Sequence, residues 1–230
     1  MIRQPTAGEL THERLGPRFA DALSTYDTRR RVDVLVDELL ADHVAGREVL
    51  DVGCGLGFFS QRLVERGGRV TACDIGPGLV EQTRARAGCT AVVADALRLT
   101  DTFGRDLFDV VVSSECIEHT PSPGEAIAQM LAVLKPGGLL SLSTPNLLWQ
   151  PVVRLATALK LRPFDGHENF SSWAAIRRTL ESRGASVLAE RGLHLFPFQL
   201  PAHRLSTWCD RHLQLTRPLM INICVLARKN

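Results

Sequence analysis

The chain has 230 residues, of which 45% are hydrophobic, and this length and composition suffice for one domain with a full buried core. The 27 basic and 25 acidic residues nearly balance, so charge gives no reason to expect a nucleic acid as partner. The amino terminus lacks the apolar core of a signal peptide, and no apolar run reaches the ~18 residues of a membrane span, so we expect a cytoplasmic protein.

Apolar runs typical of strands alternate with helical patterns along most of the chain, as in repeated βα units. Strands are predicted over residues 48–52, 69–74, 90–94, 108–113, 139–144, 185–189 and 222–227. Helices are predicted over residues 33–43, 60–66, 77–87, 124–134 and 172–183, several of which have apolar residues three or four apart. We therefore predict a single α/β domain over residues 1–230, with a core at 45–145. Residues 1–32 and 145–220 depart from the alternation and are predicted to form lid and acceptor regions.

A glycine-rich loop follows the first predicted strand. Its sequence over residues 51–57 is Asp-Val-Gly-Cys-Gly-Leu-Gly, and a helical pattern begins directly after it. Strand, glycine loop and helix in this order bring backbone amides close to a ligand. The dinucleotide fingerprint would need a glycine in place of Phe58, and no Gly-Lys-Ser/Thr follows the loop. The patterns for NAD, FAD and ATP are therefore disfavoured.

The spacing of this loop resembles motif I of the class I S-adenosylmethionine (SAM)-dependent methyltransferases. In that family the loop wraps the methionyl part of SAM, which implies cofactor contacts at Asp51, Gly53, Gly55 and Gly57. The resemblance continues through motifs IV and V and covers residues 49–146. It implies a Rossmann-like sheet of seven mostly parallel strands, with the last strand antiparallel, helices on both faces, an amino-terminal helix and a carboxyl-terminal lid insertion.

Two further predicted strands end near a carboxylate. Asp74 lies about 20 residues past the loop, where an acidic side chain can accept both ribose hydroxyl protons. Asp95 follows the third strand, and the resemblance implies that it meets the adenine amino group. Either carboxylate taken alone could instead cap a helix. Together with the glycine loop they favour a SAM site, to which we add the adjoining residues Ile75, Ala96 and Ser114.

Three arginines precede the helix that leads to the glycine loop. The resemblance suggests that one of them, Arg31, reaches the carboxylate of SAM. An exposed helix start fits these residues equally well.

Two carboxylates and an imidazole follow the fourth predicted strand. On one helical turn Glu115, Glu118 and His119 would share a face and could hold a divalent cation, Mg²⁺ or Mn²⁺, although Fe²⁺ or Zn²⁺ would also accept such ligands. This E-x-x-E-H pattern resembles the ubiquinone-biosynthesis O-methyltransferases. Two alternatives stay open, namely a metal-free site with His119 as general base and a purely structural triplet.

A metal-bound hydroxyl loses its proton readily, so the leading hypothesis is a metal-assisted methyltransferase that acts on a hydroxyl of a small molecule. A polyprenyl phenol, a sugar or a secondary metabolite would serve as acceptor, and S-adenosylhomocysteine (SAH) would be the product. The alternatives are a metal-free C- or N-methyltransferase and a SAM-binding protein without turnover.

The lid region contains the candidate acceptor contacts. They are His167, Glu168, His194, Phe196 and Phe198, each of which could instead be an ordinary surface, hydrogen-bonded or core residue. Residues 147–164 read as a basic amphipathic helix that either packs on its own domain or contacts a membrane surface or lipid. A homodimer is a further possibility.

Overall fold

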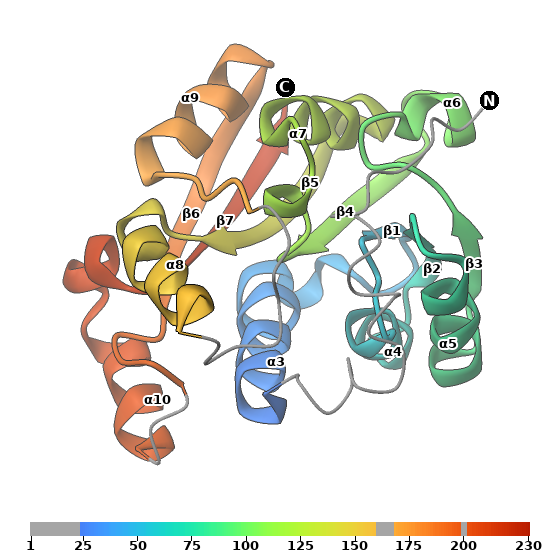
Figure 1. Cartoon of the computed structure of the whole chain (residues 1–230). Coiled ribbons are helices and arrows are strands. Elements are labelled where there is room, and N and C mark those ends of the chain that lie inside the picture. The colour runs from blue at the N-terminus through green and yellow to red at the C-terminus, as the bar shows by residue number, and fades with distance from the viewer. Residues whose placement is uncertain (1–23, 160–167, 199–201) are drawn as a thin grey trace.

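The computed structural model describes residues 24–159, 168–198 and 202–230. A seven-stranded sheet runs through it in the order β3-β2-β1-β4-β5-β7-β6 (Figure 1). The strands are β1 (Glu48–Val52), β2 (Arg69–Asp74), β3 (Thr90–Val93), β4 (Phe108–Ser114), β5 (Leu134–Pro145), β6 (Ala185–Leu193) and β7 (Asn222–Lys229). The first five strands pair in parallel, whereas β7 lies antiparallel to both β5 and β6. The predicted Rossmann-like sheet with an antiparallel last strand is thereby confirmed.

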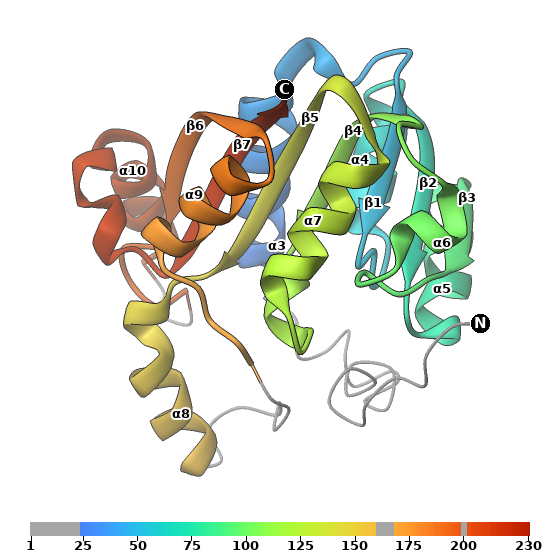
Figure 2. The same ribbon diagram turned by 90° about the horizontal axis from the view of Figure 1, so that it is seen from above.

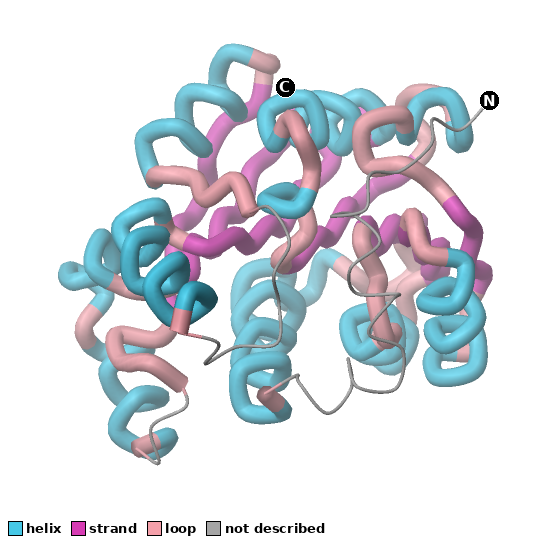
Figure 3. Tube along the Cα trace, viewed as in Figure 1, coloured by secondary structure: helices cyan, strands magenta, loops and turns pink. Residues whose placement is uncertain are grey.

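Helices cover both faces of this sheet (Figures 1 and 3). One face carries α3 (Thr25–Val32), the π-helix η1 (Asp33–Leu40), α4 (Phe58–Glu65) and α5 (Pro77–Ala87). The other carries α6 (Leu99–Phe103), α7 (Pro123–Val133) and α9 (Trp173–Ser182). The remaining helical segments are α8 (Gln150–Ala158), α10 (His203–His212) and the short 3-10 helices η2 (Ala41–His43), η3 (Ile117–His119), η4 (Leu147–Trp149) and η5 (Gln214–Leu219).

The central strands are apolar on both sides because each side faces a layer of helices. On β4, Val111 packs into the core beneath α7 and α9, while Val110 and Val112 pack into the core beneath η1 and α4. All three valines are at most 1% exposed. This two-sided burial explains why β4 reads as a continuous apolar run in the sequence.

The first helical segment begins earlier than predicted. We expected a helix from residue 33, but α3 already begins at Thr25, capped by the Ser24 hydroxyl, which accepts a hydrogen bond from the Asp27 amide. The sequence of α3 lacks the apolar periodicity that would have predicted a helix. Its buried residues Asp27, Arg30 and Arg31 form ion pairs and do not pack as apolar side chains. The helix α10 was also not predicted.

The order of the strands reverses between β1 and β4. The connections from β1 lead to β2 and β3 on one side, and β4 leads to β5 on the other. In open α/β sheets this reversal leaves a crevice at the carboxyl ends of the strands, where ligands bind. The fold therefore directs attention to the loops after β1, β2, β3 and β4.

Candidate functional site

The glycine loop after β1 is held tightly from two sides. Gly53 has φ of +74°, and a Cβ there would lie 2.5 Å from the Cys116 Sγ. Gly57 has φ of +82°, and a Cβ there would lie 2.9 Å from the Cα of Thr83 on α5. Both positions therefore require glycine, for backbone conformation and for space. The loop ends at Phe58, where α4 begins.

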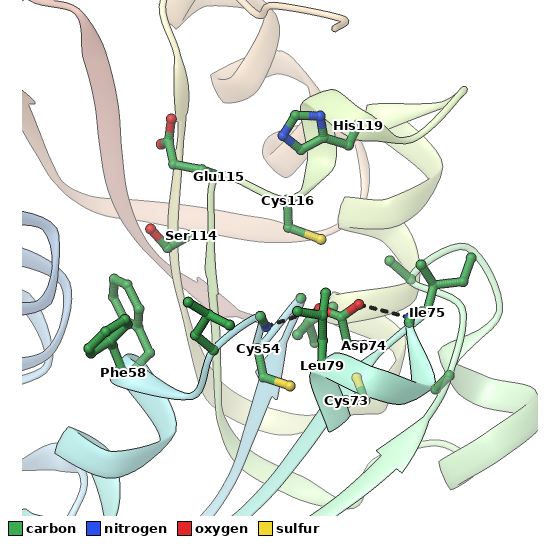
Figure 4. Close-up of a pocket in the computed structure, with 18 of the residues that line it drawn as sticks. Cys54, Phe58, Cys73, Asp74, Ile75, Leu79, Ser114, Glu115, Cys116 and His119 are labelled. Atoms are coloured by element: carbon green, nitrogen blue, oxygen red, sulfur yellow. Dashed lines mark hydrogen bonds between the residues drawn. The ribbon is translucent and has the colours of Figure 1, made fainter. Parts of the chain in front are cut away.

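A pocket lies over this loop and the carboxyl ends of the first four strands (Figure 4). Most of the predicted cofactor contacts line it, namely Arg31, Gly53, Gly55, Asp74, Ile75, Asp95, Ala96 and Ser114. Glu115 and His119 line it as well, on the side opposite Asp74 and Cys54. The predicted cofactor contacts and the residues predicted to act on the acceptor thus line one pocket.

The carboxylate of Asp74 is fixed at the centre of the pocket wall. One oxygen accepts a hydrogen bond of 3.0 Å from the Gly55 amide, and the other accepts one of 3.0 Å from the Gly76 amide. The carboxylate lines the pocket, where the sequence predicts that it accepts the hydroxyl protons of a ribose.

Asp95 is 3% exposed and lies just after β3. Its Oδ1 accepts a hydrogen bond of 2.9 Å from the Leu97 amide, which closes a local turn. The turn holds the side chain at the pocket, so the capping and the ligand-binding interpretations of Asp95 are compatible.

Two of the predicted cofactor residues do not line the pocket. Gly57 faces α5, and Asp51 is buried beneath the loop, where its Oδ2 accepts a 2.5 Å hydrogen bond from the Ser60 hydroxyl. Burial raises the pKa of Asp51 to about 7, and the nearby Asp74 carboxylate adds to the rise. Asp51 therefore ties α4 to β1 and supports the loop from below.

Arg31 is buried and reaches the pocket from α3, which excludes the exposed helix start considered above. Its Nη1 donates a hydrogen bond of 2.8 Å to the Ser114 hydroxyl, and its Nη2 donates one of 2.9 Å to Asp27. Burial alone would lower the pKa of Arg31, but the Asp27 and Glu115 carboxylates raise it instead. The site thus contains a permanent cation beside the carboxyl end of β4.

The helical turn predicted for Glu115, Glu118 and His119 is wrong. Glu115 has φ of +51°, and only Ile117–His119 form a 3-10 turn after it. The carboxylate of Glu115 consequently turns toward β5 and β7, where Ser143 and Asn222 each donate a hydrogen bond of 2.9 Å to it.

The Glu118 side chain has different partners from that of Glu115. It is 1% exposed, accepts a hydrogen bond of 3.2 Å from Thr144, and has its Oε1 3.8 Å from the Nε2 of His119. Burial raises the pKa of both glutamates, and the charge of Glu115 raises that of Glu118 further. Within the described part of the chain no three His, Cys, Asp or Glu side chains are grouped to hold a metal ion. As folded, the triplet does not fit the predicted cation centre.

The described residues among the predicted acceptor contacts lie outside the pocket lining. His167 falls outside the described residues. The Glu168 carbonyl accepts a hydrogen bond from Gln150, and His194 is fully buried against Asp27, so these two are hydrogen-bonded residues in the described fold. Phe196 is 38% exposed, and the Phe198 ring packs 5.4 Å from that of His194.

The sequence did not predict the residues that connect the predicted lid region to the segment around Glu118. The Asn169 amide donates a hydrogen bond of 2.7 Å to the Glu118 carbonyl, and its side chain donates one of 2.7 Å to the Thr120 carbonyl. The apolar pocket residues Phe58 and Leu79 were missed as well. Both follow glycine-containing strand-to-helix loops, which is the signal that could have identified them.

Comparison with known proteins agrees with this geometry. A methyltransferase-domain family model matches residues 25–190. The ubiquinone biosynthesis O-methyltransferase of Nitrosococcus oceani is 29% identical over 198 residues, covering 80% of this chain and 84% of the relative. That of Hahella chejuensis is 30% identical over 197 residues, covering 80% and 83%.

Solved structures share the fold at low identity. Magnesium protoporphyrin IX methyltransferase from Synechocystis PCC 6803 with bound SAH has a TM-score of 0.68 at 17% identity, over 96% of this chain and 99% of that one. A SAM-dependent methyltransferase from Mesorhizobium loti has a TM-score of 0.65 at 19% identity, over 87% and 96%. The chain belongs to the class I SAM-dependent methyltransferases, and its cofactor is SAM.

Proposed function

We propose that the protein transfers the methyl group of SAM to a hydroxyl oxygen of a small molecule. The observation that carries this proposal is the shared pocket, in which Glu115 and His119 lie opposite the predicted cofactor contact Asp74. The O-methyltransferase relatives at about 30% identity support oxygen as the acceptor atom.

Methyl transfer is an in-line displacement, so the enzyme has to position the acceptor and remove its proton. The acceptor oxygen forms a bond to the methyl carbon, the bond from that carbon to the sulfonium sulfur breaks, and SAH leaves. His119 lines the pocket and can take the hydroxyl proton, and its Nε2 lies 3.8 Å from the Oε1 of the buried Glu118.

Assistance by Mg²⁺ or Mn²⁺ is a second candidate. Glu118 is buried and Glu115 is half-buried, and the charge of Glu115 raises the pKa of Glu118, a repulsion that a cation would relieve. Gathering both around one ion would require them to leave their partners Ser143, Asn222 and Thr144.

A panel of acceptors tests the proposal. Purified protein is incubated with SAM and a set of phenols, catechols, sugars, amines and carbon acids, and SAH release is measured after EDTA treatment with and without added Mg²⁺. Turnover restricted to hydroxyl acceptors supports the proposal, and its dependence on Mg²⁺ decides between the two candidates. Turnover restricted to amines or carbon acids contradicts it, and SAM binding without any product indicates a non-catalytic protein.

We further propose that residues 147–164 contact a membrane surface or a lipid-like acceptor. The described part of this segment has no buried residue, and α8 projects from the body of the molecule (Figure 2). Leu148, Val152, Leu155 and Leu159 recur three or four residues apart and are each more than half exposed, next to the exposed Arg154. None of the described helices is long and apolar enough to span a membrane.

Vesicle sedimentation tests this contact. Binding to vesicles with anionic lipid that Leu155→Glu abolishes supports it, while equal sedimentation of both proteins contradicts it. A second copy of the chain is the alternative occupant, and a dimer that dissociates in the Leu155→Glu variant during gel filtration would identify it.

A further inference from the structure

A chain of buried polar side chains connects the carboxyl-terminal part of the molecule to the SAM pocket. Asp210 on α10 accepts a hydrogen bond from the backbone amide of His194 after β6, the His194 ring contacts Asp27 on α3, and Asp27 accepts hydrogen bonds from Arg31. All four side chains are at most 11% exposed. Buried charged groups are costly unless they are paired, so the contacts within this network hold its members in place.

Arg31 is anchored on one side and open on the other. Its Nε and Nη2 donate hydrogen bonds of 2.9 to 3.2 Å to the Asp27 carboxylate, and its Nη1 donates one to Ser114. A guanidinium has five N–H donors, so the hydrogen bonds among the described residues leave two for a ligand. Since Arg31 lines the pocket, these donors are available for a carboxylate of the bound cofactor.

Asp27 sets the direction of the Arg31 side chain. Burial would raise the pKa of Asp27, but the Arg31 cation and the hydrogen bond with His194 outweigh it and lower it to about 2. The side chain is therefore a carboxylate, and it requires donors on both oxygens. The Nε2 of His194, 3.0 Å from the Asp27 Oδ1, supplies one and must carry a proton to do so.

His194 is itself fixed by its backbone. Its amide donates a hydrogen bond of 2.9 Å to the Asp210 Oδ1, and its carbonyl accepts one of 3.0 Å from the Ile221 amide. Its φ is +60°, its ring is fully buried, and the rings of Tyr26 and Phe198 lie 5.6 and 5.4 Å from it. The imidazole therefore has little freedom to move away from Asp27.

We propose that His194 is a positioning residue for the cofactor: it holds the Asp27 carboxylate, which in turn aims the Arg31 guanidinium at the carboxylate of SAM. His194 does not line the pocket, so it acts only through Asp27 and Arg31. The inference depends on SAM binding in this pocket and does not depend on which acceptor is methylated.

Two substitutions separate the hydrogen bond from the backbone conformation. Asparagine tolerates positive φ well, but its shorter side chain does not reach Asp27, whereas glutamine places an amide N–H about as far out as the Nε2 of histidine. We expect His194→Asn to weaken SAH binding about tenfold and to raise the KM for SAM with little change in kcat, because hydrogen bonds to a charged group are strong. His194→Gln is expected to stay within about twofold of the wild type.

Calorimetry with two ligands tests the route through Arg31. SAH contains the amino-acid carboxylate and 5′-methylthioadenosine does not, so His194→Asn should weaken only SAH binding. The exposed His212, at the end of α10, provides the control His212→Asn, which should change neither affinity. Equal weakening of both ligands by His194→Asn, or no weakening of SAH, overturns the proposal.

Arg31→Met distinguishes the two ways of failing. If Arg31→Met leaves SAH binding unchanged, Arg31 is not the carboxylate ligand and the proposal falls with that assignment. If it weakens SAH binding while His194→Asn does not, the link through Asp27 is absent. If the proposal holds, the double variant Arg31→Met/His194→Asn binds SAH no more weakly than Arg31→Met alone. Both residues act on the same contact, the one between Arg31 and the SAH carboxylate.

Discussion

The side chain of Asn222, the first residue of β7, donates a hydrogen bond of 2.9 Å to the Oε2 of Glu115. The antiparallel last strand therefore contributes a side chain that holds the predicted catalytic residue Glu115, in addition to its place in the sheet. Ser143 on β5 holds the other oxygen of the same carboxylate at 2.9 Å. Two neighbouring strands thus fix Glu115 in a backbone conformation that few non-glycine residues adopt.

Replacement of Glu115 separates cofactor binding from turnover. Glu115→Ala is expected to retain SAH binding, because its side chain is hydrogen-bonded to Ser143 and Asn222 and not to a predicted cofactor contact, and to reduce turnover about 100-fold or more. Calorimetry with SAH and a SAH-release assay measure the two effects. Normal turnover in this variant would exclude both the metal hypothesis and a role of Glu115 at the acceptor.

Asp74→Ala should weaken SAM binding about 100-fold. The carboxylate accepts hydrogen bonds from the Gly55 and Gly76 amides, so its loss removes the predicted ribose contact and also loosens the loop. Glu81→Ala on α5, where the side chain is 70% exposed, is the matched control and should bind SAM normally. Unchanged affinity in Asp74→Ala would place the ribose elsewhere.

Asp51 predicts a pH dependence of stability. Its folded pKa of about 7 lies above the ordinary aspartate value of 3.8, so its stabilising effect is complete below pH ~4 and is lost as pH rises through 7. Relative to Asp51→Asn, the free energy of unfolding of the wild type should fall by up to ~4 kcal/mol over this range. Urea unfolding at pH 4, 5.5 and 7.5 measures the difference.

The exposed carboxylate of Asp101 provides the control for this titration. Asp101→Asn measures what the same substitution does at an exposed position. A constant difference between Asp51→Asn and the wild type at all three pH values would show that folding does not raise the pKa of Asp51.

Two glycines with positive φ should respond differently to alanine. Gly57→Ala places a Cβ 2.9 Å from the backbone of Thr83, so both strain and overlap are expected, at a cost of about 2 to 4 kcal/mol. At Gly88 nothing lies within 4 Å of the added Cβ, and only the conformational cost of about 1 kcal/mol remains. Thermal unfolding of both variants checks the order, and equal shifts would contradict it.

The glycine loop and Asp74 could be predicted from the sequence because their signals are local. The spacing of Gly53, Gly55 and Gly57 after an apolar strand, and the carboxylate at the end of the next strand, are visible in short windows. The central strands were found for the same reason, since two-sided burial leaves continuous apolar runs.

The rest depends on contacts between distant parts of the chain. Asp27 and His194 are 167 residues apart, and no short window relates them. The positive φ of Glu115 cannot be inferred from its own residue type, so the i, i+3, i+4 argument for Glu118 and His119 assumed a helix that does not form. The predicted single domain and the individual ligand contacts stay predictions.

The contact between Gly53 and Cys116 limits how this protein can change. Cys116 lies between Glu115 and His119, the predicted catalytic residues, and its sulfur occupies the space that a side chain at Gly53 would need. A larger residue at 116, selected to reshape the acceptor side, would press on the loop that holds the methyl donor. Variation in what is methylated and affinity for the donor are therefore linked at this position, and specificity can diversify more freely in the lid.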